Sequence, residues 1–345
     1  MTTTETTGRT IADAERPLWV GQTPAAWGDV VRSVDPEEAH DAGSMIAAAG
    51  LDWSVEQHPL EAVVERECQS MRVAVPRHVA NVRSDTRAVL GVVGEGYEPL
   101  QNASAFAFCD AITDSGRAHR IGGGSTRGGA RVHALMRLDR EIRIGGAEGE
   151  DVLPLLCFRN GHDGGLAVTV SVVPFRLACL NGMLLPIAGT QRTWKARHTG
   201  NVEAKLADAR RTLGIAWRYY DELEELGGRL IRERLTEGEF ERFLAGLVPL
   251  PDPTPDRTDG VRAVHNAERV REAIRTAYRA APDLDTIRGT RWGALQAVTA
   301  YVDHVQPTRR TAARTHAEAR FDRATEPQPL KDRALELLTE GGNRS

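Results

Sequence analysis

Residues 158–199 read FRNGHDGGLAVTVSVVPFRLACLNGMLLPIAGTQRTWKARHT, and this stretch decides the fold that the sequence predicts. It begins near NGHDGG, where glycines supply the positive φ angles that a hairpin reversal needs. Apolar residues then alternate with smaller or polar ones from 166 to 173, a period typical of a half-buried strand. Because the preceding residues 151–158 are nearly all apolar, the two runs are expected to pair as an antiparallel hairpin.

Further strand patterns lie upstream of this hairpin. Residues 88–100 predict two short strands around a Gly-Glu-Gly turn, and residues 131–138 alternate in a way that leaves Arg131, His133 and Arg137 on a face away from the core. The GGGSTRGG segment before them lacks the GxxxxGK[ST] spacing of a phosphate-binding loop and leads into a strand, so we interpret it as a flexible hairpin loop. A meander of about four strands is therefore expected.

Helical periodicity begins near residue 201, where apolar side chains recur every three, four or seven positions. The fold class predicted is α+β: an antiparallel β-meander with flanking helices and a helical C-terminal part. Further helices are expected at 238–247, 261–281, 290–305 and 330–338. The expected organisation is a loosely ordered segment 1–45, a core domain 46–248, a Pro/Asp-rich linker 249–260 and a helical region 261–345.

The composition is that of an ordinary soluble globular protein. No run of about 18 apolar residues is present, so no membrane contact is expected. The four cysteines show no metal-ligand spacing, which predicts reduced thiols and a cytoplasmic location. We interpret Cys179 as a buried thiol rather than a nucleophile, because no histidine is evidently positioned to activate it.

Charge is distributed unevenly along the chain. Residues 1–115 hold 8 basic and 18 acidic residues, a net of −10, whereas residues 165–220 hold 8 and 2, a net of +6. Such clustering indicates either a solvated basic face or a surface for an anionic partner. The residues proposed to contact nucleic acid are Arg131, Arg137, Arg176, Arg192, Trp194, Lys195, Arg197, His198, Arg210 and Arg211.

Two of these candidates could instead have a purely structural role. Trp194 is suited to stacking on a base, but it is equally suited to filling the core beneath the basic loop. Arg176 lies on a strand, where it could instead pair with a carboxylate inside the sheet, since a buried Arg is rarely left unpaired.

Metal binding is a weaker hypothesis, and no cofactor is predicted. The candidate ligands are His162, Asp163, Asp303 and His304, and nothing in the sequence shows that the two pairs meet. Asp163 is better explained by the turn it occupies between glycines. His304 lies at the expected end of a helix, where a histidine can satisfy terminal carbonyl groups.

Six motifs resemble one known family. They are LGVVGEGYEPLQN at 90–102, GGSTRGGARV at 123–132, NGHDGG at 160–165, PFRLACLNG at 174–182, KARHTGN at 195–201 and WGALQAVTAYVDH at 292–304. In order and spacing the chain resembles the phage/plasmid-like proteins grouped as domain of unknown function 932 (DUF932). Gln296 and Ala300 depart from the family pattern, which has Asn and Glu there. The family's occurrence in phages, plasmids and integrated elements implies work on element DNA or in host defence.

A second resemblance concerns architecture alone. A β-meander followed by a long helix with a basic start is similar to the core of single-strand annealing proteins of the Rad52 and phage recombinase type. This resemblance implies a basic groove that holds single-stranded DNA. We therefore predict a non-enzymatic single-stranded DNA-binding or annealing protein that forms homo-oligomers. The alternatives are a metal-dependent enzyme acting on nucleic acid, or an interaction protein that blocks a host defence factor.

Overall fold

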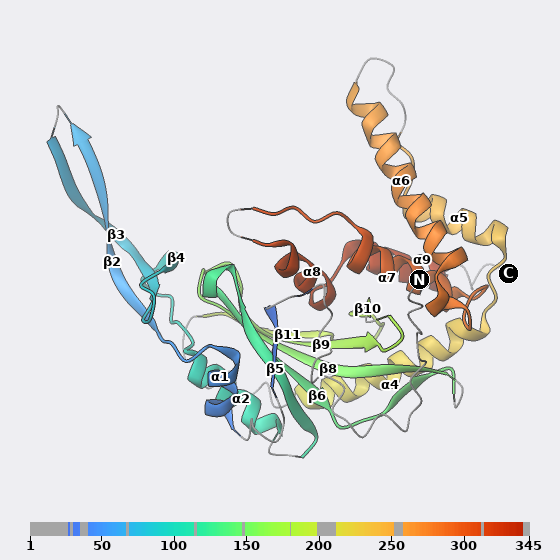
Figure 1. Cartoon of the computed structure of the whole chain (residues 1–345), viewed down its shortest axis with the longest axis horizontal. Coiled ribbons are helices and arrows are strands. Elements are labelled where there is room, and N and C mark those ends of the chain that lie inside the picture. The colour runs from blue at the N-terminus through green and yellow to red at the C-terminus, as the bar shows by residue number, and fades with distance from the viewer. Residues whose placement is uncertain are drawn as a thin grey trace, which may run out of the picture.

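The computed structural model describes residues 27, 30–34, 41–66, 69–113, 116–146, 149–179, 181–198, 212–251, 258–311 and 314–340. The expected α+β class is confirmed: antiparallel sheets are combined with helices, several of which lie in the C-terminal part (Figure 1). Two elements project from the body, the β2–β3 hairpin at one end and helix α6 at the other. None of the described helices combines the length and apolar character needed to cross a bilayer.

The main sheet has eight strands, and we call it sheet A. Its hydrogen-bonded order is β1-β5-β6-β8-β9-β10, with β11 also pairing with β9 and β7 with β8, and every pair is antiparallel. The central β8–β9 hairpin is the one predicted from residues 151–173. The strands are β1 Arg32–Ser33, β5 Ala118–Thr126, β6 Arg131–Leu138, β7 Ile142–Ile144, β8 Glu150–Gly161, β9 Val168–Arg176, β10 Asn181–Gly182 and β11 Thr193–Ala196.

The smaller sheet is a three-stranded ribbon, and we call it sheet B. It consists of β2 Val55–Arg66, β3 Gln69–Arg83 and β4 Val89–Gly94, paired in that order. The base of sheet B is attached to sheet A through the β8–β9 turn, because Asn81 Nδ2 donates to the carbonyl oxygen of His162 over 2.7 Å. The outer half of β2–β3 extends beyond β4 (Figure 1).

Both faces of sheet A are covered. One face, which we call the α4 face, carries side chains such as Phe158 and Val170 in the larger hydrophobic core. The other, the α8 face, buries Leu135, Val173 and Phe175 in a second cluster beneath α8 and Trp27. The helices are α1 Ala42–Ala49, α2 Asn102–Thr113, α4 Thr212–Arg232, α5 Glu237–Leu247, α6 Thr258–Ala280, α7 Arg291–Ala300, the π-helix η5 Tyr301–Val305, α8 His316–Thr325 and α9 Pro329–Glu340, with short 3₁₀ turns at Arg127–Gly129 and Pro282–Leu284.

Two local expectations differ from the structure. The segment GGGSTRGG, expected to be a hairpin loop throughout, is a loop only in part: residues up to Thr126 belong to strand β5, and Arg127–Gly129 form the short turn to β6. A Cβ at Gly124 would lie 2.2 Å from the carbonyl oxygen of Val30, so a glycine there allows the N-terminal segment to approach the sheet closely. His133, expected on a face away from the core, is buried because Phe321 of α8 packs against it with ring centroids 4.3 Å apart.

Candidate nucleic-acid interface

The turn of the β8–β9 hairpin gathers four of the six motif segments. Tyr97 donates a hydrogen bond to the carbonyl oxygen of Gly161, and Asn160 Nδ2 donates to that of Leu100 over 2.9 Å. His162 lies 3.2 Å from Asn102 Oδ1 through its Nε2 atom. His198 stacks on Tyr97 with centroids 4.7 Å apart. The backbone N–H of His162 donates to the carbonyl oxygen of Ala130 over 2.8 Å. Segments 90–102, 123–132, 160–165 and 195–201 therefore meet at one end of sheet A.

The other two motifs meet at the opposite end of the same hairpin. His304 Nε2 lies 2.8 Å from Asn181 Oδ1, and the backbone N–H of Gly182 donates to Asp303 Oδ2 over 2.9 Å. The ammonium of Lys331 lies 2.6 Å from Asp303 Oδ1, so the buried carboxylate has a cationic partner. Burial raises the pKa of Asp303, and the nearby Lys331 opposes that shift. Buried hydrogen bonds and an ion pair therefore connect β10, η5 and α9 at this end of the hairpin.

The four weak metal candidates do not form a site. His162 and Asp163 lie at the turn, whereas Asp303 and His304 lie at the β10 end, so the two pairs are separated by the length of β9. Asp163 Oδ1 accepts from the N–H of Gly165 over 2.8 Å and thus shapes the turn. Burial lowers the pKa of His162 to about 4. Across the described ranges, no three His, Cys, Asp or Glu side chains converge in a way that could hold a metal ion.

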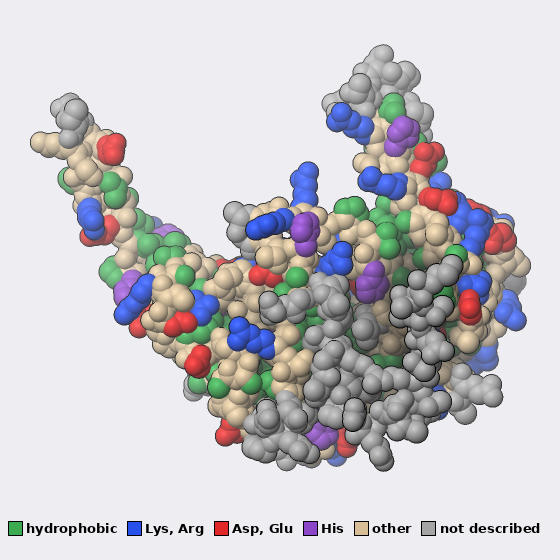
Figure 2. All heavy atoms as spheres, viewed as in Figure 1, with side chains coloured by type: hydrophobic (Ala, Val, Ile, Leu, Met, Phe, Trp, Pro, Cys, Tyr) green, Lys and Arg blue, Asp and Glu red, His purple; other side chains and the backbone are tan. Residues whose placement is uncertain are grey.

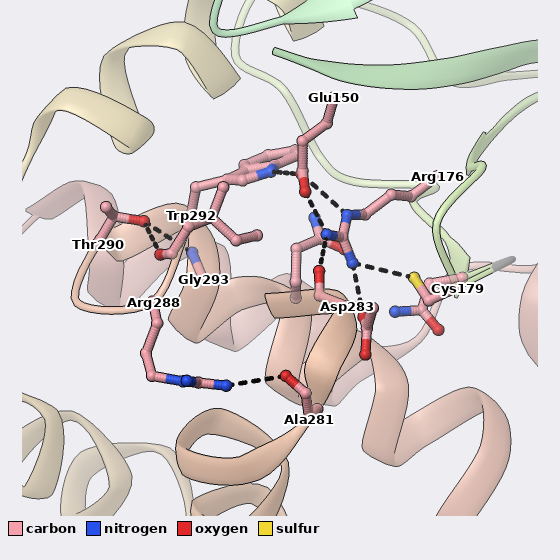
Figure 3. A network of polar contacts seen from close by, with 12 residues as sticks. Glu150, Arg176, Cys179, Ala281, Asp283, Arg288, Thr290, Trp292 and Gly293 are labelled. Atoms are coloured by element: carbon pink, nitrogen blue, oxygen red, sulfur yellow. Dashed lines mark hydrogen bonds and ion pairs between the residues drawn. The ribbon is translucent and has the colours of Figure 1, made fainter. Parts of the chain in front are cut away.

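Arg176 belongs to a buried ion-pair network rather than to a surface (Figure 3). Its Nε atom donates to Glu150 over 2.8 Å, and its NH1 atom donates to Asp283 over 2.7 Å. Trp292 Nε1 donates to the same Glu150 carboxylate over 2.7 Å. Cys179 lies beside the guanidinium, and burial raises the pKa of its thiol to about 11. The network joins the end of β9 to the 3₁₀ turn Pro282–Leu284 and to α7.

Four further sequence candidates are paired or partly buried. Arg192 makes a bidentate ion pair with Asp332, with both distances at 2.8 Å, and Arg131 pairs with Asp163 over 3.3 Å. Trp194 is half-buried and packs against the larger core, as the structural alternative predicted. Arg137 is half-buried, and burial lowers its pKa. These side chains therefore have limited freedom to contact a phosphate backbone.

Lys195 and Arg197 remain exposed, and neither pairs with a carboxylate in the described part of the chain. Strand register places Lys195 opposite Thr169, which lies opposite Arg159. Side chains in one cross-strand row point to the same face, so Lys195 projects on the α8 face, about 10 Å from Arg159. Arg210 and Arg211 lie outside the described residues.

The structure adds a cationic group that the sequence analysis did not single out. Arg309 and Arg310 are exposed in the segment that leads into α8, and no described carboxylate pairs with either of them. This segment is fastened to α8, since Arg323 donates to the carbonyl oxygens of Gln306 and Pro307 over 2.5 and 2.6 Å. Burial lowers the pKa of Arg323, and the neighbouring Arg314 adds to that shift.

Helix α8 is placed on the same side of sheet A as Lys195. Asp322 accepts from Arg159 over 2.5 Å, and Arg159 also pairs with Glu326. Figure 2 shows Lys and Arg side chains above α8, on the surface between the two projections. The sequence carried a signal for this helix, because Thr315 and Glu318 form a capping box at its start. We call Lys195, Arg197, Arg309 and Arg310 the cationic surface.

The fold and this surface define an α+β protein with an exposed group of cations on one side of a covered antiparallel sheet. The family model described as Domain of unknown function (DUF932) matches residues 89–325, and the chain therefore belongs to this family. The resemblance carried by the six motifs is thus confirmed. No curated protein and no solved structure matches the chain. The architectural resemblance to single-strand annealing proteins stays a prediction.

Proposed function

We propose that this chain binds single-stranded DNA, without itself catalysing a reaction, in the recombination or maintenance of a mobile element. The observation that carries the proposal is the cationic surface, in which two separate segments present charges that no described carboxylate neutralises. Binding to a nucleic-acid backbone depends on cations that are available to displace condensed counterions. Arg176 and Arg192 are not part of the cationic surface, because their charges are paired with carboxylates inside the protein.

A single strand suits this surface better than a duplex does. Lys195 lies on β11 at the edge of sheet A, whereas Arg309 lies in the segment before α8. A nucleic acid that contacts both must therefore follow a track over an uneven protein surface. A flexible strand can follow such a track and can stack its bases on guanidinium planes. That the DNA belongs to a mobile element is inferred from the family resemblance, since members of the family occur in phages, plasmids and integrated elements.

Fluorescence anisotropy of labelled oligonucleotides, single- and double-stranded, over a salt series tests the proposal. The expected result is tighter binding of the single strand, with an affinity that falls steeply as salt increases. In the double variant Arg309→Ala/Arg310→Ala, the slope of log affinity against log salt should fall by up to ~1.4, from ~0.7 for each lost phosphate contact.

The matched control is Arg218→Ala/Arg232→Ala. Both arginines are exposed on α4, which packs on the opposite face of sheet A, and the variant loses the same charge. The control should retain the wild-type slope. Equal loss in the two variants would mean that net charge alone governs binding, and no binding at low salt would reject the proposal.

A further inference from the structure

The outer half of the β2–β3 hairpin has no third strand. β4 pairs only with His78–Val82 of β3, while Glu61–Arg66 and Gln69–Ala74 pair only with each other. We call this outer half the arm. An isolated two-stranded hairpin is marginally stable in water, and further strands or a packed face are needed to support it. The arm would therefore be stabilised by packing against another surface.

Strand register divides the arm into an apolar and a polar face. Ala62 lies opposite Val73, and Val64 lies opposite Met71, so these four side chains share one face. The other face carries an ion pair between Arg72 and Glu61 over 3.4 Å, together with Val63, Glu65 and Ser70. The arm is thus amphipathic, although both of its faces are exposed.

The apolar face continues onto the base of sheet B. Side chains two residues apart on β2 point the same way, so Val64 shares its face with His58, which lies opposite Ala80. Ala80 pairs with Val92, and an irregularity beside Asn81 brings Val89 opposite Val82, on that same face. Sheet B carries six of the nine exposed large apolar side chains in the described part of the chain, and five of these lie on this face: Val64, Met71, Val73, Val89 and Val92.

We propose that this apolar face of sheet B docks face to face on the same face of a second copy of the chain. Residues 61–74, which span the arm, hold three acidic residues, Glu61, Glu65 and Glu67, and two basic ones, Arg66 and Arg72, a net of −1. An arm with so small a net charge repels a like arm only weakly, and its negative sign offers no attraction to a polyanion such as DNA. A two-fold axis would place each valine and methionine against its counterparts.

Stacking of faces is favoured over pairing of strand edges. Pro59 lies on β2 and Pro76 on β3, and proline cannot donate to a further strand. Arg77, next to Pro76, has a φ of 60°, which interrupts the regular edge of β3. Association through strand edges is therefore obstructed. The face itself stays accessible, and Glu56, the charged residue at its base, has His58 and Arg87 as partners.

The size of the face predicts a reversible contact. From Glu56 to Arg66 the ribbon is about 35 Å long, and two or three strands are about 10–15 Å wide. Each copy would then bury roughly 350–500 Å², which is below the ~800 Å² per partner of a typical stable interface. The dimer should accordingly form and dissociate with changes in chain concentration. It does not depend on the binding of nucleic acid.

Sedimentation velocity of the full chain without nucleic acid, over a wide concentration range, tests this assignment. Wild type should shift from monomer to dimer as concentration rises. Val64→Lys/Met71→Lys places two charges on the apolar face and should raise the dimer dissociation constant at least about tenfold. Val92→Lys, in the three-stranded base, should act in the same direction and does not rely on the folding of the arm.

The matched control is Val63→Lys/Ser70→Lys, which adds the same two charges to the exposed polar face of the same arm. This variant should dimerise like wild type. A wild-type chain that stays monomeric at every concentration would overturn the proposal, and so would equal weakening by the control. Anisotropy with the single-stranded oligonucleotide separates the two proposals, because the apolar-face variants should keep the intrinsic affinity of a monomer for DNA.

Discussion

At the end of β9, the guanidinium of Arg176 is 1% exposed and lies between the carboxylates of Glu150 and Asp283. Removal of one partner from a buried ion pair leaves the other charge without compensation, which typically costs ~3–5 kcal/mol. Arg176→Ala should therefore lower the free energy of unfolding by about that amount, as measured by urea denaturation. Any loss of DNA binding in this variant would follow from unfolding, so the variant says nothing about direct contact.

An exposed ion pair provides the comparison. Arg229 is 55% exposed and lies 3.9 Å from Glu233 on the surface of α4. Because solvent screens such pairs, Arg229→Ala should change the free energy of unfolding by only ~0–1 kcal/mol. Similar losses in the two variants would contradict the view that the Arg176 network supports the joint between β9 and α7.

Two buried histidines predict a pH dependence of stability. Burial lowers the pKa of His133 to about 3 and that of His162 to about 4, whereas both titrate near their ordinary value of 6.5 in the unfolded chain. As pH falls from 6.5 to 5, the unfolded chain binds protons that the folded chain does not, so stability falls. The limiting slope is ~1.4 kcal/mol per pH unit for each histidine.

Replacement of one of these histidines checks the assignment. In His133→Gln, the slope of unfolding free energy against pH between 6.5 and 5 should decrease by up to ~1.4 kcal/mol per pH unit. The slope is the diagnostic quantity, since the substitution also shifts absolute stability. An unchanged slope would contradict this account, because it would show that His133 takes up protons equally in the folded and unfolded chains.

Helices and strands with a strong hydrophobic periodicity could be predicted from the sequence, whereas those that depend on tertiary contacts could not. The β8–β9 hairpin and the helices α5, α6, α7 and α9 follow from residue spacing, and the structure contains each of them. Helix α8 was missed because its Arg-rich composition masks a short apolar face that packs through Phe321. The glycine-rich part of strand β5, residues 122–126, was predicted to be a loop. Gly124 allows Val30 to approach the sheet closely, and no local pattern reveals that contact.

Gly124→Ala tests that account of β5. The added methyl group would overlap the carbonyl oxygen of Val30, so the N-terminal segment must shift, and overpacking of this kind typically costs ~1–3 kcal/mol. Gly96→Ala is the control, since a Cβ there meets no atom within 4 Å. Thermal unfolding should give a lower midpoint for Gly124→Ala and a midpoint near wild type for Gly96→Ala. A neutral Gly124→Ala would mean that β1 can move away at little cost.

For the whole molecule, the sequence indicated a cationic region but could not indicate which charges are free. The net of +6 over residues 165–220 includes Arg176 and Arg192, whose partners Glu150, Asp283 and Asp332 lie far away in the chain. Arg309 and Arg310 lie on the same side of sheet A as Lys195 only because α8 packs on that side. The division into a core, a linker at 249–260 and a C-terminal region stays a proposal, although Leu244 and Tyr278 contribute to the same core.

The cationic surface predicts that two separate segments hold one strand. If a single strand crosses both, Lys195→Ala/Arg197→Ala and Arg309→Ala/Arg310→Ala should each lower the salt slope by up to ~1.4, and the combined variant by up to ~2.8. On an oligonucleotide too short to reach both segments, the second pair of substitutions should add little to the first. Anisotropy titrations with long and short oligonucleotides measure both effects. Equal slopes for the combined variant and either pair alone, on the long strand, would show that only one of the segments contacts the DNA.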